Sequence, residues 1–389
     1  MPMNNYQKKQ FSQLMTKLFK DNAYYKELAK AIKYEQIGPE EIYRMLPYQN
    51  RKSLQNLGNK IYTSFSEDVI VEMTSGTTGE PLECPKKNEE RISLALDLWD
   101  KRRRIDPLLK KDDFFLLYGS KARKYHNFFN YDLENLKKCM RFLAEINPRW
   151  ICGSISAFER YSNEIVNGNL SNDMTNLRYI ELQGEYVDKS VRELVEQAFQ
   201  AKTIVHYGNR EMWTIAYECL GGKLHTNDRM GYFEIKKENQ GDKYGHIIVT
   251  SFNQVTLPIV KYDTGDIGRI VECECVCGQK HALEIIDGRV STIIKGTKLN
   301  GNIIMKGILN DVIKKNQKII SRFYVEQIEL NTFLVYIEKG PEYGLCIENK
   351  IKEAFRKRIS EGVKVVFKYT SDMLSYVENK CPIFRVCCE

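Results

Sequence analysis

The stretch VEMTSGTTGEPLECPKK, residues 71–87, places four hydroxyl side chains and two glycines in the six residues 74–79. The segment DVIVEM that ends at residue 73 has the composition of a strand, and RISLALDLWDKRRR, residues 91–104, has the pattern of a helix. A strand, a glycine-rich loop and a helix in this order present backbone N–H groups and hydroxyls to a phosphate. The alternative is a solvated turn rich in Ser, Thr and Gly, and a lone motif does not separate the two.

The composition is that of an ordinary globular protein. The chain has 389 residues, of which 42% are hydrophobic and 28% are charged, enough for two or three domains. No apolar run reaches membrane-spanning length, and the start, MPMNNYQKKQFSQLM, has no apolar signal core. We therefore expect a cytoplasmic protein with no membrane partner.

The net charge of +8 has two possible meanings. The basic residues are spread along the chain, and their densest cluster, Lys101–Arg104, ends a predicted helix, where it complements the helix dipole and solvates a face. We therefore expect no nucleic-acid partner, while a modest positive balance suits polyanionic nucleotides. Eleven cysteines in a chain without a secretory signal are expected to be reduced, and most of them to be small buried hydrophobic residues.

The order of predicted elements indicates an α/β fold. Residues 1–65 have a helical, amphipathic pattern with a break at 37–50. Beyond them, strand-like segments such as FFLLYG (114–119) and KTIVHYG (202–208) alternate with helical ones such as VRELVEQAFQ (191–200). This alternation predicts mixed, partly parallel sheets flanked by helices, with ligands beyond the carboxyl ends of the strands.

The pattern changes after DGRVSTIIKG, residues 287–296. The segments FYVEQIEL, FLVYIEKG, ENKIKEAFRKRI and VKVVFKYT read as strand, strand, helix and strand. We therefore predict a large N-terminal domain over residues 1–288 and a small α+β C-terminal domain over residues 289–389.

Cysteine and histidine residues near the domain boundary suggest a metal site. The segment CECVCGQKH, residues 273–281, has cysteines at alternate positions, which would share one face of a strand. Upstream, Cys219 and His225 lie six residues apart across a Gly-Gly turn. With Cys275 and Cys277 they make a set that suits tetrahedral, structural Zn²⁺. Cys273 and His281 are alternative ligands, and a hairpin of reduced cysteines is the competing interpretation.

Four further motifs follow TSGTTG in a fixed order: HYGNRE (206–211), KYDTGDIGR (261–269), DGRVSTIIKGTKLNG (287–301) and NKCPIFRV (379–386). The ordered set resembles the adenylate-forming (acyl-activating) superfamily, whose members make an acyl-AMP from a carboxylic acid and ATP. The compact chain, the CVCG element at 275–278 and the segment at 147–162 most resemble the phenylacetate–CoA ligase branch, which includes coenzyme F390 synthetases and CapK-like proteins. The resemblance spans roughly residues 60–389, and that branch carries a similar zinc site.

The resemblance implies a role for each motif. The nucleotide would be bound by the loop at its phosphates, by the YG pair at adenine and by acidic and basic groups at the ribose. The implied residues are Thr74, Ser75, Gly76, Thr77, Thr78 and Gly79 for the phosphates, Tyr207 and Gly208 for adenine, Asp266 and Arg289 for the ribose, Lys295 for further charge, and Glu211 for Mg²⁺. Gly184 and Glu185 match an element beside the acid and nucleotide pockets, although they could equally form a turn.

The sequence departs from the family pattern at two places. Ser291 stands where the hinge motif usually has aspartate, and a serine still permits rotation about the hinge. The C-terminal lysine that the family uses in adenylation is replaced by Ile383 if IFRV aligns with the usual KFRV. If the loop is shifted, Lys380 supplies the charge, and we favour Lys380; Lys295 or Lys298 is a third possibility.

The resemblance therefore implies an ATP-dependent, AMP-forming ligase with catalytic residues Lys380, Glu211 and Arg289. The expected substrate is an aromatic carboxylic acid, and the expected acceptor is the thiol of CoA or of a carrier protein's phosphopantetheine. Two alternatives stay open: transfer of AMP to a cofactor, as in F390 synthetases, and binding of nucleotide or acyl-adenylate without turnover. A homodimer is a further possibility.

Overall fold

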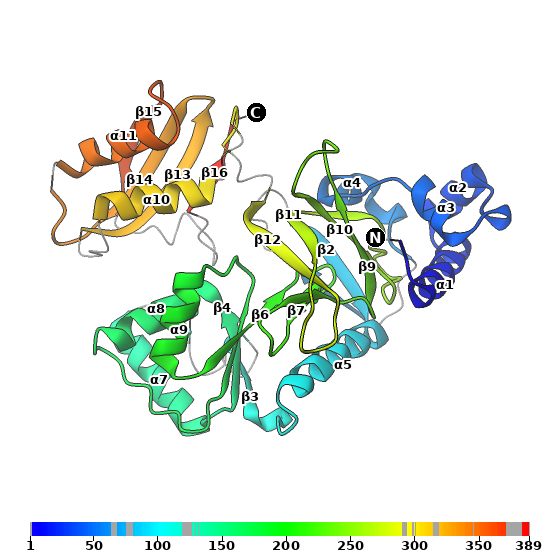
Figure 1. Cartoon of the computed structure of the whole chain (residues 1–389), viewed down its shortest axis with the longest axis horizontal. Helices are drawn as coiled ribbons and strands as arrows, with labels where there is room; N and C mark the ends of the chain where they lie inside the picture. The colour runs from blue at the N-terminus through cyan, green and yellow to red at the C-terminus, as the bar shows by residue number, and fades with distance from the viewer. Residues whose placement is uncertain are drawn as a thin grey trace. The chain divides into compact units, whose positions relative to one another are not determined.

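The computed structural model describes residues 2–63, 68–74, 81–118, 127–128, 130, 132–289, 294–297, 299, 301–313, 319–344, 346–370 and 383–388. The chain forms two compact units, one built from most of the chain up to Ile285 and the other mainly from Ile286 onward. Figure 1 shows the elements of each unit. None of the helices in the described ranges is long and apolar enough to cross a membrane.

The large unit begins with four helices, as the amphipathic pattern predicts: α1 (Asn5–Asp21), α2 (Ala23–Ile32), α3 (Pro39–Met45) and α4 (Arg51–Leu57). Asn4 caps α1 in a reciprocal capping box with Gln7, and the side chain of Asn22 caps α2. The predicted break at 37–50 is only partly correct, because α3 begins there with a proline at its first position, where a missing N–H costs nothing.

A six-stranded sheet forms the centre of the large unit, in the order β3-β4-β5-β6-β7-β8. Its first four strands are parallel and its last two pairings are antiparallel. The strands are β3 (Phe114–Leu116), β4 (Trp150–Ser154), β5 (Tyr179–Gln183), β6 (Lys202–Tyr207), β7 (Ala216–Glu218) and β8 (Leu224–Thr226). The mixed, partly parallel sheet predicted from the sequence is therefore confirmed.

Helices cover both faces of the parallel strands. The connecting helices are α7 (Leu133–Ile146), α8 (Ile155–Val166) and α9 (Lys189–Phe199), and they gather on one face (Figure 1). Ile180 and Leu182 of β5 point into the apolar core on that side. The other face carries Trp150 and Ile204, which pack with residues from the end of α5 (Asn88–Ile105).

One member of the basic cluster at the end of α5 is buried, contrary to the prediction of a solvated face. Arg102 is 6% exposed and forms a bidentate pair with the fully buried Glu181 of β5, at 2.7 and 3.0 Å. His206 Nδ1 and Trp150 Nε1 lie 2.9 and 3.0 Å from the same carboxylate. The charge of Glu181 is thus fully satisfied, as a buried charge requires.

Two smaller sheets lie wholly or mainly in the large unit. The first pairs β1 (Val69–Met73) with β2 (Glu83–Lys87) in antiparallel register. The second has the order β12-β11-β10-β9. Its strands are β9 (Gly231–Lys236), β10 (Gly245–Ser251), β11 (Tyr262–Glu272) and β12 (His281–Arg289).

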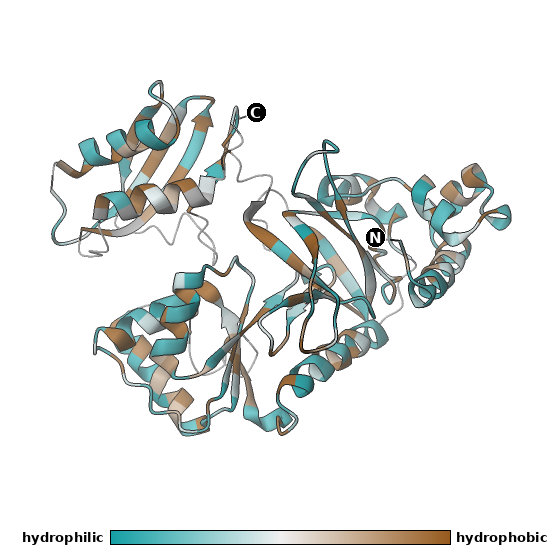
Figure 2. Ribbon diagram, in the orientation of Figure 1, coloured by the Kyte–Doolittle hydropathy of each residue, from teal (hydrophilic) through white to brown (hydrophobic). Residues whose placement is uncertain are grey.

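The small unit has one sheet, ordered β15-β14-β13-β16, and two helices. The elements are α10 (Gly301–Ile313), β13 (Ile320–Glu329), β14 (Thr332–Lys339), α11 (Cys346–Arg358), β15 (Lys364–Tyr369) and β16 (Phe384–Val386). Phe333, Phe355 and Phe384 meet in its core. Figure 2 shows hydrophilic residues on α11 and hydrophobic ones in the strands, as expected for a helix that covers one face of a sheet.

Candidate functional site

Thr74 forms the neck of the glycine-rich loop between β1 and β2. Its N–H donates to the Leu82 carbonyl at 3.0 Å, and its Oγ1 accepts from the Leu82 N–H at 2.8 Å. Arg51 Nη2 donates to the same hydroxyl at 2.6 Å. The hydroxyl of Thr74 therefore closes the loop in this structure. The other predicted phosphate residues, Ser75, Gly76, Thr77, Thr78 and Gly79, lie outside the described residues.

The HYGNRE motif forms a tight loop after β6. Tyr207 ends the strand and packs, half-buried, against the apolar core that contains Met212, Ile215 and Tyr262. Gly208 is required, because an added Cβ would lie 1.7 Å from the Trp213 carbonyl oxygen. Asn209 accepts hydrogen bonds from the N–H groups of Met212 and Trp213, both at 2.8 Å. The backbone on both sides of Glu211 is therefore fixed.

Glu211, the predicted magnesium ligand, is 7% exposed. The hydroxyl of Tyr262, the first residue of β11, donates to Glu211 Oε1 at 2.8 Å, and the Gln254 amide donates to the Glu211 carbonyl. Burial, reinforced by the nearby Glu211, raises the pKa of Tyr262 above its usual range and that of the Cys84 thiol to about 12. Lys86 of β2 donates to the Arg210 carbonyl at 2.7 Å, so the residue before Glu211 lies beside the strand that follows the glycine-rich loop.

Gly184 and Glu185 follow β5 in a turn, with Gly184 at a φ of 87°. The Glu185 carboxylate accepts from the N–H and the hydroxyl of Ser156, both at 2.9 Å. Ser156 lies in the first turn of α8, so Glu185 satisfies a free donor at this helix N-terminus. This contact favours the interpretation of Gly184 and Glu185 as a turn. Their position beside the acid and nucleotide pockets remains a prediction.

The remaining nucleotide residues come from several segments. Asp266 lies half-buried in β11, and Arg289 is the last residue of β12. Lys295 is exposed and lies in a turn that the side chain of Gln327 holds with two hydrogen bonds. The Lys295 N–H donates to Gln327 Oε1 at 2.8 Å, and Gln327 Nε2 donates to the Lys295 carbonyl at 3.1 Å. Ile383 packs, half-buried, against the small unit's core. Lys380, Lys298 and Ser291 lie outside the described residues.

Four predicted metal ligands meet at one point of the large unit. The ligand atoms of Cys219, His225, Cys275 and Cys277 all lie within 4.8 Å of one another. The Sγ atoms of Cys219 and Cys275 are 3.4 Å apart, and Cys277 Sγ is 3.3 Å from His225 Nε2. Zn–S and Zn–N bonds of about 2.3 and 2.0 Å give tetrahedral edges of about 3.5–3.8 Å. The four residues therefore fit a zinc ion.

The turn geometry accounts for this cluster. Cys219 and His225 flank the turn between β7 and β8, where Gly222 has a φ of 71°. Cys275 and Cys277 lie in the turn between β11 and β12, where the Gly278 N–H donates to the Cys275 carbonyl at 2.8 Å. A hydrogen bond from the Cys277 backbone lowers the pKa of Cys275 below the usual thiol value.

The strand expected over residues 273–281 is wrong, since β11 ends at Glu272 and β12 begins at His281. Cys273 therefore does not share a face with the ligand cysteines, and its sulfur lies 3.9 Å from the Gln279 carbonyl. His281 contributes its backbone: its carbonyl oxygen is 2.6 Å from His225 Nδ1. That contact fixes the tautomer that leaves Nε2 free for a metal.

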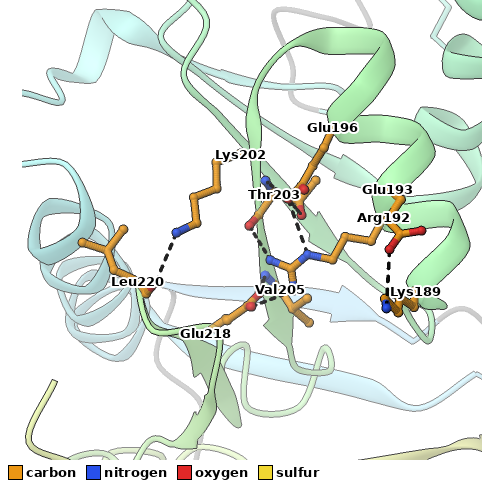
Figure 3. Close-up of polar contacts among 9 residues, drawn as sticks. All are labelled: Lys189, Arg192, Glu193, Glu196, Lys202, Thr203, Val205, Glu218 and Leu220. Atoms are coloured by element: carbon orange, nitrogen blue, oxygen red, sulfur yellow. Dashed lines mark hydrogen bonds and ion pairs between the residues drawn. The ribbon is translucent and has the colours of Figure 1, made fainter. Parts of the chain in front are cut away.

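A buried carboxylate that sequence patterns did not indicate supports the turn with Cys219 and His225. Glu218, 3% exposed, accepts from Arg192 Nη1 and from the Val205 N–H, both at 2.7 Å (Figure 3). Arg192 Nη2 also donates to the Thr203 carbonyl at 2.9 Å. Glu218 precedes Cys219, so it links this turn to α9 and β6. A buried carboxylate beside a ligand cysteine carries no signal that sequence reading would detect.

No protein family and no curated protein matches the sequence. Among solved structures, a 2-hydroxyisobutyryl-CoA ligase in the postadenylation state in complex with R3-HIB-AMP has a TM-score of 0.69 at 12% identity, over 98% of this chain and 88% of that chain.

Two further ligases are similar over less of their length. The O-succinylbenzoate coenzyme A synthetase MenE from Bacillus subtilis, in complex with AMP, has a TM-score of 0.52 at 14% identity, over 77% of this chain and 65% of that chain. A benzoate CoA ligase from Burkholderia xenovorans LB400 has a TM-score of 0.52 at 10% identity, over 83% and 69%. The resemblance read from the motifs is confirmed at the level of the fold: this chain has the fold of the adenylate-forming ligases.

Proposed function

We propose that this protein activates a carboxylic acid with ATP, releasing pyrophosphate and forming an acyl-adenylate. The observation that carries the proposal is the position of Glu211: it is buried, held by Tyr262, and preceded by Arg210, whose carbonyl accepts from Lys86 of β2. A phosphate-binding loop and a carboxylate for Mg²⁺ are the two parts that ATP activation needs in one place. The similar 2-hydroxyisobutyryl-CoA ligase, solved with an adenylate, supports the assignment.

In the proposed reaction, an oxygen of the substrate carboxylate attacks the α-phosphorus of ATP, and pyrophosphate leaves. No protein nucleophile is needed, so the chain's residues bind and orient the reactants. Residues 74–79 would hold the phosphates, Tyr207 and Gly208 the adenine, and Asp266 with Arg289 the ribose. Mg²⁺ bound through Glu211 would offset phosphate charge, and Lys380 would add a positive charge at the reacting centre.

We further propose that a thiol then attacks the acyl carbon and releases AMP. The acceptor would be CoA or a phosphopantetheine, and a similar ligase has been solved with 2-HIB-AMP and CoA. The step would need the domain over residues 289–389 to rotate about the segment from Arg289 to Ser291. We propose an aromatic acid and the phenylacetate–CoA ligase branch from the motifs at 147–162 and 275–278.

A second candidate is nucleotide binding without turnover. Ile383, which takes the place of the usual catalytic lysine in one alignment, packs against the small unit's core and offers no charge. Loss of such a cation would cost about 3 kcal/mol in the transition state, on the order of a hundredfold in rate.

The test is acid-dependent pyrophosphate release with ATP and Mg²⁺ over a panel of aromatic and aliphatic acids, for the wild type and Lys380→Ala. Release with one acid that the variant loses supports the ligase and the role of Lys380. Unchanged release in the variant supports the ligase assignment and indicates that a residue other than Lys380 supplies the positive charge. ATP binding without release for any acid supports the second candidate.

A further inference from the structure

A lysine is buried in the hairpin that carries the glycine-rich loop. Lys86, on β2, is 1% exposed, and its Nζ donates to the Arg210 carbonyl at 2.7 Å and lies 3.3 Å from Glu72 Oε2. Lysine is almost never fully buried unless it is paired. The residue thus joins the hairpin to the loop that contains Glu211, at the peptide directly before that carboxylate.

Glu72 makes a second connection between the same two segments. It lies on β1, diagonally across from Lys86, because Ile70 is opposite Lys86 and Glu72 is opposite Cys84. Trp213 Nε1 donates to Glu72 Oε2 at 2.8 Å, and Arg91 Nε of α5 lies 3.9 Å from Oε1. The loop from Arg210 to Trp213 is therefore tied to the hairpin on both sides of Glu211.

The hairpin depends on such contacts for its place. A two-stranded sheet is marginal without packing against something else. Ile70, Val71 and Met73 of β1 are 45–50% exposed, so this strand buries little apolar surface. The Lys86 and Glu72 contacts therefore help to hold β1 in position.

Stability alone is a poor reason for this ion pair. Desolvation of two charges offsets most of their attraction, and apolar residues of similar size often serve equally well. The ammonium of Lys86, with its two acceptors, does specify the direction and the distance between the segments that it joins. An apolar contact does not.

We propose that Lys86, together with Glu72, is a positioning residue: it holds the β1–β2 hairpin in a fixed position relative to Glu211, so that the phosphates and the metal are bound together. This inference rests on the proposed function, since it assigns the loop to the phosphates of ATP. Lys86 itself acts through Glu72, Arg210 and Trp213 and touches no reactant. Its loss therefore weakens the binding of Mg·ATP and leaves the apparent KM for the acid unchanged.

The test compares Lys86→Met, Lys86→Arg and Trp213→Phe with the wild type. Calorimetry gives the Kd for Mg·ATP without acid, and pyrophosphate release gives the Mg²⁺ concentration at half-maximal rate. Misplacement of a reacting group by about 1 Å can lower a rate on the order of a hundredfold. Because Lys86→Met displaces the hairpin from Glu211, we expect this variant to bind Mg·ATP at least about tenfold more weakly. We expect Lys86→Arg to recover part of the loss. Lys137→Met, which breaks an exposed pair with Glu134, is the control and should bind as the wild type does.

Wild-type protein that binds no Mg·ATP would contradict the proposed function. Wild-type protein that binds, with Lys86→Met within twofold of it, would overturn the inference and leave the function standing. An equal rise in the KM of the acid would also overturn it, because that indicates general loosening. If Lys86→Met does not fold, Trp213→Phe decides: it keeps the buried charges, removes one contact to Glu72, and should weaken Mg·ATP binding in the same direction.

Discussion

The Tyr262 hydroxyl donates a 2.8 Å hydrogen bond to Glu211 Oε1, and both side chains are buried. Tyr262→Phe would leave this carboxylate oxygen without its donor in the protein interior. We expect the free energy of unfolding to fall by about 1–3 kcal/mol, as measured by urea denaturation. We also expect a higher Mg²⁺ requirement for pyrophosphate release, because the carboxylate loses its fixed orientation.

Tyr6→Phe is the matched control for this change. Its hydroxyl also makes one hydrogen bond, to the Arg229 carbonyl at 3.0 Å, but the side chain is 48% exposed and water can replace the partner. We expect its unfolding free energy to stay within about 0.5 kcal/mol of the wild type. Equal effects of the two variants would contradict a special role for the contact with Glu211.

Buried tyrosines make the fold sensitive to alkali. Burial raises the pKa of Tyr25, Tyr43 and Tyr262 well above the usual value in the folded state. In the unfolded chain they ionise near pH 10, so their stabilising contribution is complete below about pH 10 and declines above it. We expect tyrosinate absorbance to rise in two phases, the second coinciding with loss of helical circular dichroism. Complete ionisation before that loss would contradict the burial argument.

We propose that Cys219, His225, Cys275 and Cys277 bind zinc, and we therefore expect one bound ion per chain. We expect Cys275→Ser and His225→Ala to lose it and Cys273→Ser to retain it, because Cys273 lies outside the four-residue cluster. Substituted Co²⁺ gives a thiolate absorption band that reports tetrahedral binding without any activity assay. Affinity should fall as pH falls, because thiolate ligands must be deprotonated. Loss of the band in Cys273→Ser, or its persistence in Cys275→Ser, would contradict the ligand set.

Sequence patterns predicted the elements that local physics determines. The strands predicted to end at residues 73 and 208 and the helix predicted over 191–200 follow from periodicity and appear as β1, β6 and α9, with β6 ending at Tyr207. The cluster of Cys219, His225, Cys275 and Cys277 was predictable because the two turns carry the ligands at short spacing. The spacing within each pair of ligands is a local property of its own turn. The two turns themselves are distant in the sequence, with β9 and β10 between them.

Contacts between distant segments were beyond such patterns. Arg102 and Glu181 pair 79 residues apart, and nothing near Arg102 in the sequence separates it from its exposed neighbours. Glu185 caps α8 through Ser156, which is 29 residues away. The alternation of Cys273, Cys275 and Cys277 suggested a strand, but the chain turns there. In each case tertiary packing decided what local propensity left open.

Glu218 links the turn between β7 and β8, which carries Cys219 and His225, to β6 and α9. Glu218→Gln removes the buried partner of Arg192, so we expect the unfolding free energy to fall by about 3 kcal/mol. Glu193→Gln, on the same helix as Arg192, is the control, because Glu193 pairs with Lys189 (Figure 3). The side chain of Lys189 is 89% exposed and that of Glu193 is 66% exposed, so the effect should stay below about 0.5 kcal/mol. Because Glu218 precedes Cys219, we also expect faster Zn²⁺ release to a chelator in Glu218→Gln alone. Equal release rates in the two variants would show that the metal site does not depend on this link.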